Sequence, residues 1–450
     1  MSIKNKIMIQ NTLKTIKIQS KIVLLVLLLV GTVTVSYASV NFQEQTSFEE
    51  YKGKVTDADT KKPLVSATLS IEGTNISTIT NSEGEFALKV PTTIENAKLK
   101  VSFLGHKSKI LILANLEKNN LKIKLEASVT QLEEVAVQAP KSALKLVKET
   151  FENKGKNYFE DPTLMTAFYR ETIKKRRKNV SLSEAVVNIY KTPYSSDKKD
   201  IIELYKARKS TDYSKLDTLA LKLQGGPFNA LFVDIMKYPE YIFTDKSIDW
   251  YDYSFEKSIR INDRVIYVIN FEQKNSLVDQ LYKGQLFIDA ENKILTSATY
   301  SLNITDKDAA ARLFVKKKPA KAKVYPTEVE YKVDYREKDN KWYYGYSNAE
   351  LQFKVNWDDK LFNSVYTMNC EMAITDWEKN LSKSNIKNKF RLKQNIILVD
   401  QAIGFSDPDF WGEYNIIEPE KSIESAIKKI KRQLKKAKNK GTASVPKPRP

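Results

Sequence analysis

Residues 281–302, LYKGQLFIDAENKILTSATYSL, contain the clearest strand pair of the chain. Gly284–Asp289 and Ile294–Leu302 are rich in β-branched and aromatic residues, and Asp289-Ala-Glu-Asn292 between them supplies turn residues. Similar runs occupy Val265–Phe271, Thr327–Tyr335, Lys341–Tyr346 and Leu351–Val355. A short helix is expected just after Lys141, because Leu144, Val147 and Phe151 share a helical face. This pattern predicts a large antiparallel α+β domain over residues 141–418.

The region before residue 141 contains shorter strand-like runs. Seven short runs with alternating apolar and polar residues are separated by turn residues such as Asn81-Ser82-Glu83-Gly84. These runs are Tyr51–Thr56, Ala67–Glu72, Ile76–Thr80, Glu85–Val90, Lys98–Phe103, Lys107–Leu113 and Leu121–Leu125. Because no helical pattern lies between them, residues 46–128 are predicted to form a small antiparallel β-sandwich.

Several linked motifs in this region carry a resemblance. They are Gly53-Lys-Val-Thr-Asp57, Pro63-Leu-Val-Ser-Ala67, Ile71-Glu-Gly-Thr74, Thr80-Asn-Ser-Glu-Gly-Glu-Phe86 and Val101-Ser-Phe-Leu-Gly105. Together they resemble the carboxypeptidase-regulatory-like domain, a transthyretin-like sandwich common in the cell envelopes of Bacteroidetes-type bacteria. The resemblance implies a seven-stranded sandwich and no peptidase activity, since the module is an accessory in carboxypeptidases. The family usually has an aromatic residue where His106 stands, which favours a packing or surface role for this histidine.

The remaining segments extend this picture. Residues 129–140 are interpreted as a linker. Their Gln131–Val137 portion is similar to the link that follows this module in TonB-dependent transporters. An added strand or a partner-binding segment is therefore an alternative interpretation of these residues. Residues 141–430 resemble exported Bacteroidetes proteins that carry the same first domain. Their strand succession also looks like the lipoprotein-carrier fold, a curved antiparallel sheet around a helix. The predicted fold class is therefore mainly β, with a basic C-terminal helix.

The N-terminus has the features of an export signal. Its first 21 residues contain five lysines and no acid, Ile22–Val30 is apolar, and Ser36-Tyr37-Ala38 offers small residues for cleavage. Residues 1–38 are therefore predicted to be a signal peptide, with an uncleaved anchor as the alternative. The expected location is the periplasm or the outer membrane.

Basic charge is concentrated at the other end. Residues 421–450 hold eleven Lys or Arg against Glu424, so residues 39–420 carry a formal net charge of only +4. That near balance removes the main support for nucleic-acid binding. Within the tail, Ile423, Ile427, Ile430 and Leu434 follow a helical spacing, which predicts an amphipathic helix over 419–440. It either docks on the sheet or contacts anionic membrane. Residues 441–450 are expected to be disordered.

Catalytic chemistry has few candidate residues. With one histidine and one cysteine, the chain cannot supply the imidazoles of a zinc site or an internal disulfide, and no cofactor or metal is expected. Cys370 is expected to be buried and inert. A carboxylate pair drawn from Glu171, Glu184, Asp249 and Asp252 is the enzymatic alternative. The basic run 174–178 is interpreted as a solvated turn or strand end.

Aromatic side chains offer the clearest candidate ligand site. Tyr251, Tyr253 and Phe255 alternate along one predicted strand, and Trp342, Tyr344 and Tyr346 along another, so each set is expected to share a face. Either these rings line a groove for a lipid or sugar, with Tyr251, Tyr253, Trp342 and Tyr344 as ligand contacts, or they pack the sheet.

The sequence therefore predicts an exported envelope protein that acts by binding or assembly without catalysis. Its partner is an unidentified envelope protein, glycan or lipid. The alternatives are a periplasmic carrier of a lipid or other apolar ligand in a curved-sheet groove and, third, a carboxylate-dependent hydrolase.

Overall fold

The computed structural model describes residues 47–128, 130–131, 142–176, 178–211, 223–256, 258–261, 264–274, 281–315, 318, 320–358, 361–380, 390–404, 410–420 and 423. The predicted signal peptide (1–38), most of the basic helix (419–440) and the predicted disordered tail (441–450) lie outside these residues. Among the described residues, no helix combines the length and apolar character needed to cross a bilayer.

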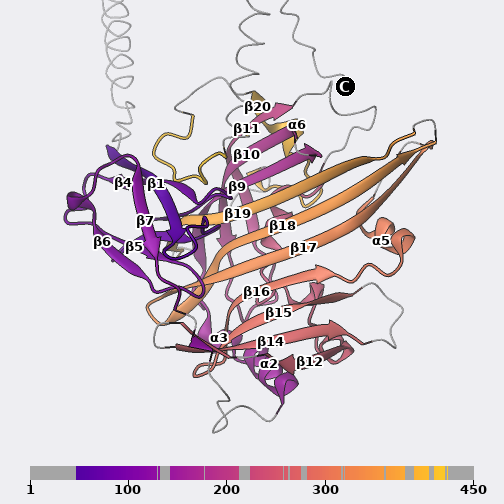
Figure 1. Ribbon diagram of the computed structural model, residues 1–450, viewed down its shortest axis with the longest axis horizontal. Helices are drawn as coiled ribbons and strands as arrows, with labels where there is room; N and C mark the ends of the chain where they lie inside the picture. The colour runs from indigo at the N-terminus through magenta and orange to yellow at the C-terminus, as the bar shows by residue number, and fades with distance from the viewer. Residues whose placement is uncertain are drawn as a thin grey trace, which may run out of the picture. The chain divides into compact units, whose positions relative to one another are not determined.

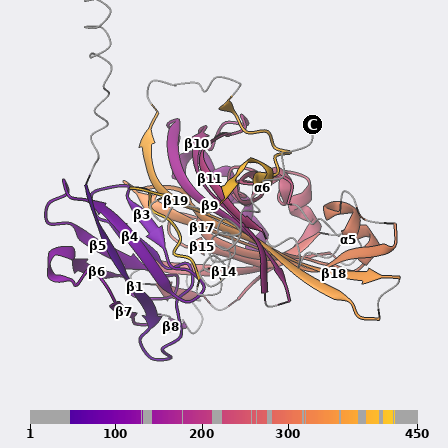
Figure 2. The same cartoon turned by 90° about the horizontal axis from the view of Figure 1, so that it is seen from above.

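The N-terminal region is the predicted sandwich (Figures 1 and 2). Its strands are β1 (Phe48–Asp57), β2 (Thr68–Ile71), β3 (Ser77–Ile79), β4 (Glu85–Pro91), β5 (Lys98–Ser102), β6 (Lys109–Ile112) and β7 (Leu121–Leu125). One sheet has the order β4-β1-β7 and the other β3-β2-β5-β6, with β1 and β7 parallel and the remaining pairs antiparallel. Apolar residues of both sheets, such as Val55, Leu69 and Leu99, meet in one fully buried core.

The rest of the chain is built on one large sheet, whose order in the described residues is β20-β11-β10-β9-β19-β18-β17-β16-β15-β14-β13-β8, with β12 also paired to β14. The strands are β8 (Thr130–Gln131), β9 (Thr163–Lys175), β10 (Lys178–Lys191), β11 (Ile201–Thr211), β12 (Tyr251–Phe255), β13 (Ile259–Ile261), β14 (Arg264–Gln273), β15 (Tyr282–Asp289), β16 (Ile294–Leu302), β17 (Ala322–Lys338), β18 (Lys341–Trp357), β19 (Ser364–Lys379) and β20 (Ile403–Gly404). Apart from the β11–β20 pair, it is antiparallel, which confirms the predicted mainly β class.

Helices are few and short. They are α2 (Ala143–Glu152), α3 (Lys154–Asn157), α4 (Phe228–Leu231), α5 (Lys307–Phe314) and α6 (Leu398–Gln401), with 3-10 turns η2 (Leu113–Asn115), η3 (Pro239–Tyr241) and η4 (Ser247–Trp250). The helix α2 begins at Ser142, whose side chain accepts a hydrogen bond from the Lys145 N–H and so caps the first turn. Its buried Leu146 and Val147 pack into the core of the large sheet.

Two predicted strands are in fact one. Lys341–Tyr346 and Leu351–Val355 both belong to β18, which runs unbroken for 17 residues beside β17 and β19. The pairing with β17 shifts by one residue between Asp334 and Tyr335, which leaves Gly345 of β18 without a partner. Such a bulge reverses the alternation of side chains along the strand.

The linker prediction needs one correction. Within residues 129–140, Thr130 and Gln131 form β8, which pairs with Ile259 and Arg260 of β13 at the edge of the large sheet. The added strand that the sequence left open is therefore present at these two residues. The chain continues the large sheet before α2 begins, because the β13 edge offers unpaired backbone groups.

Candidate functional site

The predicted aromatic contacts lie mainly in the core. The exposed fraction is 2% for Tyr251, 8% for Trp342 and 0% for Tyr344, and all three belong to the apolar cluster on one face of the large sheet. Tyr253 is half-buried, packs against the same cluster and donates a hydrogen bond to the Ile248 carbonyl at 2.9 Å. Sheet packing, the alternative left open, describes Tyr251 and Tyr344, whereas Tyr253 also borders the large groove on the sheet and Trp342 borders a smaller one.

The second stripe does not share one face. Because Gly345 forms the bulge, Tyr344 points into the main core while Tyr346 packs with Phe168 and Trp411 on the opposite face. The expectation that Trp342, Tyr344 and Tyr346 line up is therefore wrong for Tyr346. Strict alternation fails wherever a strand carries an extra residue.

The four candidate catalytic carboxylates are not brought together. Glu184 pairs across the strands with Arg170, and Glu171 with Ser183, so the two glutamates point to opposite faces. Asp249 forms an ion pair with Lys148 at 2.8 Å, and Asp252 is exposed on β12. Glu171 is buried, and this burial raises the pKa of its carboxyl to about 7. None of the other three candidates is therefore placed beside Glu171 as the pair of a glycosidase would be.

His106 and Cys370, the single histidine and the single cysteine, both have structural surroundings. The His106 ring packs edge-on against Phe103, and its Nε2 lies 2.8 Å from the Asp57 carboxylate. Cys370 is buried in the sheet, and burial raises the pKa of its thiol to about 12, so the nucleophilic thiolate is disfavoured. Within the described ranges, no group of three or more His, Cys, Asp or Glu is arranged to hold a metal ion.

One face of the large sheet is covered by the chain itself. The helices α2 and α4 and the segment 232–251 pack over it and enclose a core that includes Tyr169, Ile189, Phe271 and Leu286. This is the face on which a carrier of an apolar ligand would need free space. Here it is filled by side chains of the same protein.

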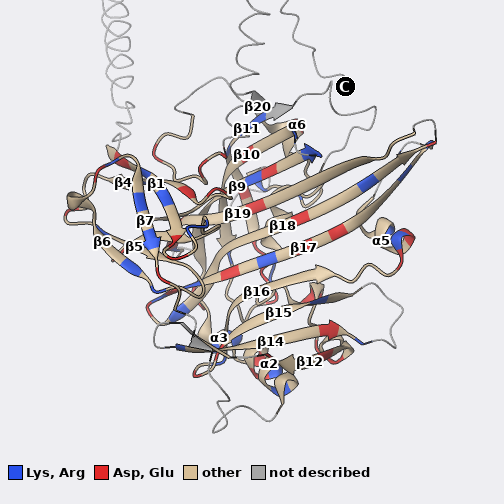
Figure 3. Ribbon diagram, viewed as in Figure 1, with Lys and Arg blue, Asp and Glu red and all other residues tan. Residues whose placement is uncertain are grey.

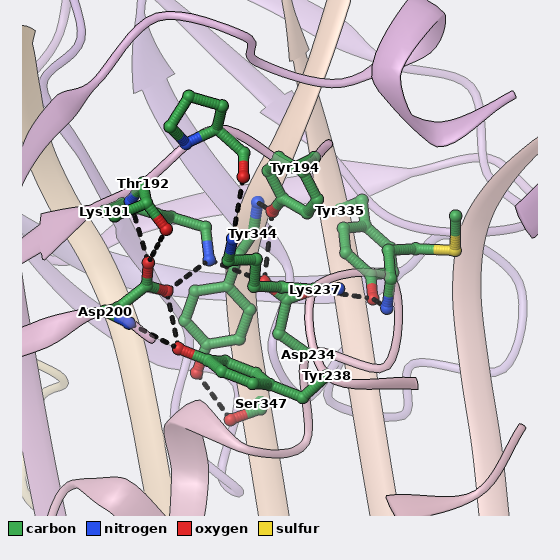
Figure 4. Close-up of polar contacts among 12 residues, drawn as sticks. Lys191, Thr192, Tyr194, Asp200, Asp234, Lys237, Tyr238, Tyr335, Tyr344 and Ser347 are labelled. Atoms are coloured by element: carbon green, nitrogen blue, oxygen red, sulfur yellow. Dashed lines mark hydrogen bonds and ion pairs between the residues drawn. The ribbon is translucent and has the colours of Figure 1, made fainter. Parts of the chain in front are cut away.

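A buried polar network fastens this cover (Figure 4). Lys191 on β10 contacts Asp200 at 3.0 Å and Asp234, in the covering segment, at 2.8 Å. Tyr194 donates to Asp234 at 3.1 Å, and Tyr335 on β17 donates to the other carboxylate oxygen at 3.0 Å. The network therefore joins the strands β10 and β17 to the segment that lies over the sheet.

The electrostatics of this network indicate a structural role. The exposed fraction is 3% for Lys191, 5% for Asp200 and 0% for Asp234. Burial by itself lowers the pKa of the Lys191 ammonium, but the two carboxylates outweigh it and raise the pKa. A cation held between two buried anions is satisfied, and no ligand can reach it from solvent.

The opposite face of the sheet is partly covered by the sandwich and by residues 410–420, and the rest of it is open and polar. Residues directly opposite each other in paired strands point to the same side, so the register traces rows of side chains across the sheet. The first row is Arg170, Glu371, Asn348, Lys332, Thr299, Gln285, Asn270 and Ser254. The second row is Thr172, Asn369, Glu350, Glu330, Ser301, Lys283, Glu272 and Asp252. We call these two rows the polar ladders.

All sixteen ladder residues border one groove of about 1200 Å³. Half of them are neutral amides or hydroxyls, and the others carry charges of both signs, as the interspersed colours of Figure 3 illustrate. Lysine, arginine and amide nitrogens donate hydrogen bonds, whereas carboxylate and amide oxygens accept them. The floor can therefore satisfy a long ligand that is rich in both donors and acceptors.

The sandwich forms one wall of this groove through Val65, Ser66, Thr80, Asn81, Ser82 and Phe103. It is held to the sheet by hydrogen bonds: Lys332 Nζ donates to Ser66 Oγ at 2.8 Å, Arg336 Nη1 to Ser77 Oγ at 2.7 Å, and Ser77 Oγ to the Ile374 carbonyl at 3.0 Å. The first domain thus completes the groove that the second domain opens.

The C-terminal segment borders the groove beside the sandwich. Arg170, which is 2% exposed, bonds Glu184 at 2.8 Å and Glu371 at 3.3 Å and donates to the Ile417 carbonyl. This buried cation anchors residues 410–420, and Glu420 and Ile423 then border the groove. Ile423 is 2% exposed and packs on Leu182, so the start of the predicted basic helix docks on the sheet.

Sequence reasoning missed the polar ladders. Each strand shows its own polar alternation, such as Thr299 and Ser301 or Asn348 and Glu350. What the sequence hides is which strands are neighbours and in what register, because the rows join residues from 170 to 371. The alternating polar positions of long strands were the available signal.

Comparison with known proteins confirms the first resemblance. The family model of the CarboxypepD_reg-like domain matches residues 51–137. No curated protein matches the chain. Among solved structures, the chain is similar to a DUF1329 family protein from Desulfovibrio piger ATCC 29098, with 11% identity, a TM-score of 0.23, and coverage of 54% of this chain and 96% of the other.

Two further structures show similarity. One is a putative outer membrane lipoprotein-sorting protein domain from Vibrio parahaemolyticus, with 11% identity, a TM-score of 0.24, and coverage of 55% of this chain and 95% of the other. The other is lipovitellin, described for its lipid–protein interactions, with 8% identity, a TM-score of 0.24, and coverage of 52% of this chain and 27% of the other.

Proposed function

We propose that this chain is an exported protein of the cell envelope that binds a glycan in the groove over the polar ladders, without catalysing a reaction on it. The observation that carries the proposal is the continuous floor of sixteen donors and acceptors, walled by the sandwich and by the C-terminal segment. The signal-like N-terminus supports export.

A glycan fits this floor for a chemical reason. Vicinal hydroxyls donate and accept at the same carbon pair, and planar amide groups can serve both roles at once, while carboxylates accept. Asn348, Gln285 and Asn270 offer such groups along one row, next to hydroxyls and charges. Phe103 and Tyr346 at the sandwich side add apolar surface for a sugar face.

The carrier of an apolar ligand remains the second candidate, and one feature of the fold opposes it. The apolar face of the sheet is occupied by α2, α4 and the segment 232–251, fastened by the Lys191 network. An acyl chain would have to displace a packed core to bind there.

The test is calorimetric titration of the purified mature chain with soluble peptidoglycan fragments and with lipopolysaccharide core oligosaccharide. We expect saturable binding of at least one of them, weakened about tenfold or more in the Asn348→Ala/Gln285→Ala variant, because two bidentate groups are lost. Asn119→Ala, an exposed change in the sandwich, is the matched control. The bound glycan should be recovered with unchanged mass.

Three results would overturn the proposal. The first is equal binding by the double variant and the control. The second is cleavage of the glycan by the wild-type chain. The third is absence of glycan binding together with co-purified lipid in native mass spectrometry, which would instead favour the carrier.

A further inference from the structure

The turn between β18 and β19 carries two apolar side chains in solvent. The exposed fraction is 90% for Leu361 and 74% for Phe362, which makes them the most exposed large apolar residues among the described ones. Both follow the strand β18 at the end of the long hairpin that reaches the right of Figure 1. An adjacent pair of large apolar groups held away from any core is a feature of interaction sites.

Basic residues surround this turn because of how the strands pair. The Asp358 N–H donates to the Lys321 carbonyl at 3.1 Å, which places the start of β17 beside the turn. The Arg176 N–H donates to the Val365 carbonyl at 2.9 Å, which places the β9–β10 turn on its other side. The described basic residues at this end are Lys175, Arg176, Lys178, Lys318, Lys321, Lys323 and Lys354.

The charge at this end is strongly one-sided. Against these seven cations the described part of the turn holds Asp358, and the neighbouring helix α5 adds Asp308. Arg176, Lys178, Lys321 and Lys323 are exposed. Lys175, Arg176 and Lys178 of the basic run therefore belong to a larger cationic rim around Leu361 and Phe362.

From this arrangement we propose that Leu361 and Phe362, just before β19, dock on a membrane surface with anionic headgroups. Leu361 and Phe362 enter the boundary between headgroups and acyl chains, and the surrounding lysines and arginines contact the anionic groups. Long basic side chains can reach headgroups while their apolar stems stay beside the inserted residues. The contact is peripheral, because two inserted side chains reach no further than the boundary of the bilayer.

An acidic protein surface would also attract the cationic rim, but it would not require two apolar side chains to enter hydrocarbon. The test therefore reports on the environment of position 362. The chain has a single cysteine, Cys370, which is buried, so Phe362→Cys provides one accessible thiol for an environment-sensitive fluorophore. Ile110→Cys, at a residue 54% exposed on the sandwich, is the matched control.

The probes are vesicles of phosphatidylcholine alone and of phosphatidylcholine with phosphatidylglycerol, added to the full chain. We expect the label at position 362 to shift its emission to the blue with the anionic vesicles, and the label at position 110 to remain unchanged. In sedimentation with the same vesicles, Leu361→Ser/Phe362→Ser should bind about tenfold more weakly or worse, because two apolar groups no longer leave water. Ile110→Ser/Ile112→Ser should bind as the wild type.

The salt dependence gives an independent readout. Lys321→Glu/Lys323→Glu should weaken binding at low salt, with a smaller difference at high salt where surface charges are screened. Lys98→Glu/Lys100→Glu, which changes two exposed lysines of the sandwich, is the matched control. A solvent-like label at position 362 while the chain sediments with vesicles would overturn the proposal, because another segment would then hold the membrane. Equal sedimentation of Leu361→Ser/Phe362→Ser and the wild type would also overturn it.

Discussion

The two faces of the large sheet are built from the same strands and differ in almost every physical respect. On the covered face, Tyr169, Cys370 and Ala349 occupy successive strands and are buried under helices. On the open face, their sequence neighbours Arg170, Glu371 and Asn348 belong to a polar row that borders the groove. One alternation of side chains thus produces a core and a candidate binding surface.

This difference separates stability from function along each strand. Charges on the covered face are buried and paired, so a change there leaves a partner unsatisfied. Apart from Arg170 and Glu371, which lie under the C-terminal segment, charges on the open face remain near water, so the same change alters the fold little and the ligand site directly. Equivalent substitutions on the two faces should therefore give very different results, and each of the following predictions tests that contrast.

The largest effect is expected at Lys191. Replacing it by Met leaves the Asp200 and Asp234 carboxylates buried without their cation. Removing one partner of a buried ion pair costs about 3–5 kcal/mol, so the urea midpoint should fall sharply. Lys283→Met on the open face should change the free energy of unfolding by less than about 0.5 kcal/mol.

A triple variant sharpens this result. Lys191→Met combined with Asp200→Asn and Asp234→Asn removes all three charges and should recover most of the lost stability, because uncharged buried groups need no counterion. If Lys191→Met alone unfolds at the wild-type urea concentration, the network does not fasten the cover.

The second prediction concerns pH and Glu171. Burial raises the pKa of this carboxyl to about 7 in the folded chain, against 4.5 for the free group. Below pH 4.5 the carboxyl is protonated in both the folded and the unfolded chain, so it does not change the free energy of unfolding. Between pH 4.5 and about 7 it ionises in the unfolded chain but stays protonated in the folded chain, so the stability of the fold decreases as pH rises. Above pH 7 the native state bears the full cost, about 3 kcal/mol at 1.36 kcal/mol for each pKa unit.

Glu171→Gln removes this titration. The variant should be more stable than the wild type above pH 7, and the difference should vanish towards pH 4. Urea unfolding at several pH values measures it, with the exposed change Glu72→Gln as control. A constant difference between variant and wild type across this range would contradict a raised pKa.

A smaller effect is expected at Ile423, on the border of the groove. Its side chain is buried against Leu182, and Ile423→Ala should cost about 1–3 kcal/mol, at the lower end of core truncations because the cluster is small. Deleting residues 436–450 removes charge and almost no apolar area, so thermal unfolding should be unchanged. Equal melting of Ile423→Ala and wild type would mean that this residue does not dock.

The sequence reveals these features unequally, for physical reasons. All seven sandwich strands could be located because each ends at turn residues within a few positions, so the signal is local. The order of the large sheet depends on partners such as β9 and β19, about 200 residues apart, and no local pattern selects that pairing. The polar ladders follow from that register and were therefore out of reach.

Tyr344 and Tyr346 illustrate the limit at a single position. They are two residues apart, and alternation predicts one face for both. Gly345 between them reverses the outcome through a one-residue shift against β17. Likewise, the buried Lys191 looks like any surface lysine until Asp234 is brought over it from a covering segment.

The smallest effect on stability is expected for a charged residue of the open face, Glu330. Glu330 and Glu350 stand directly opposite each other on β17 and β18, and burial together with the neighbouring carboxylates of Glu328 and Glu350 raises the pKa of Glu330. Glu330→Gln should therefore stabilise the chain by a few tenths of a kcal/mol near pH 7, since like charges in opposing positions repel. Because these groups are exposed, added salt should remove most of the gain. If the proposed glycan site is correct, this more stable variant should nevertheless bind the ligand more weakly, because a floor acceptor has become a mixed donor and acceptor. A loss of stability in Glu330→Gln would show that the open face contributes to the fold, and the contrast between the two faces would fail.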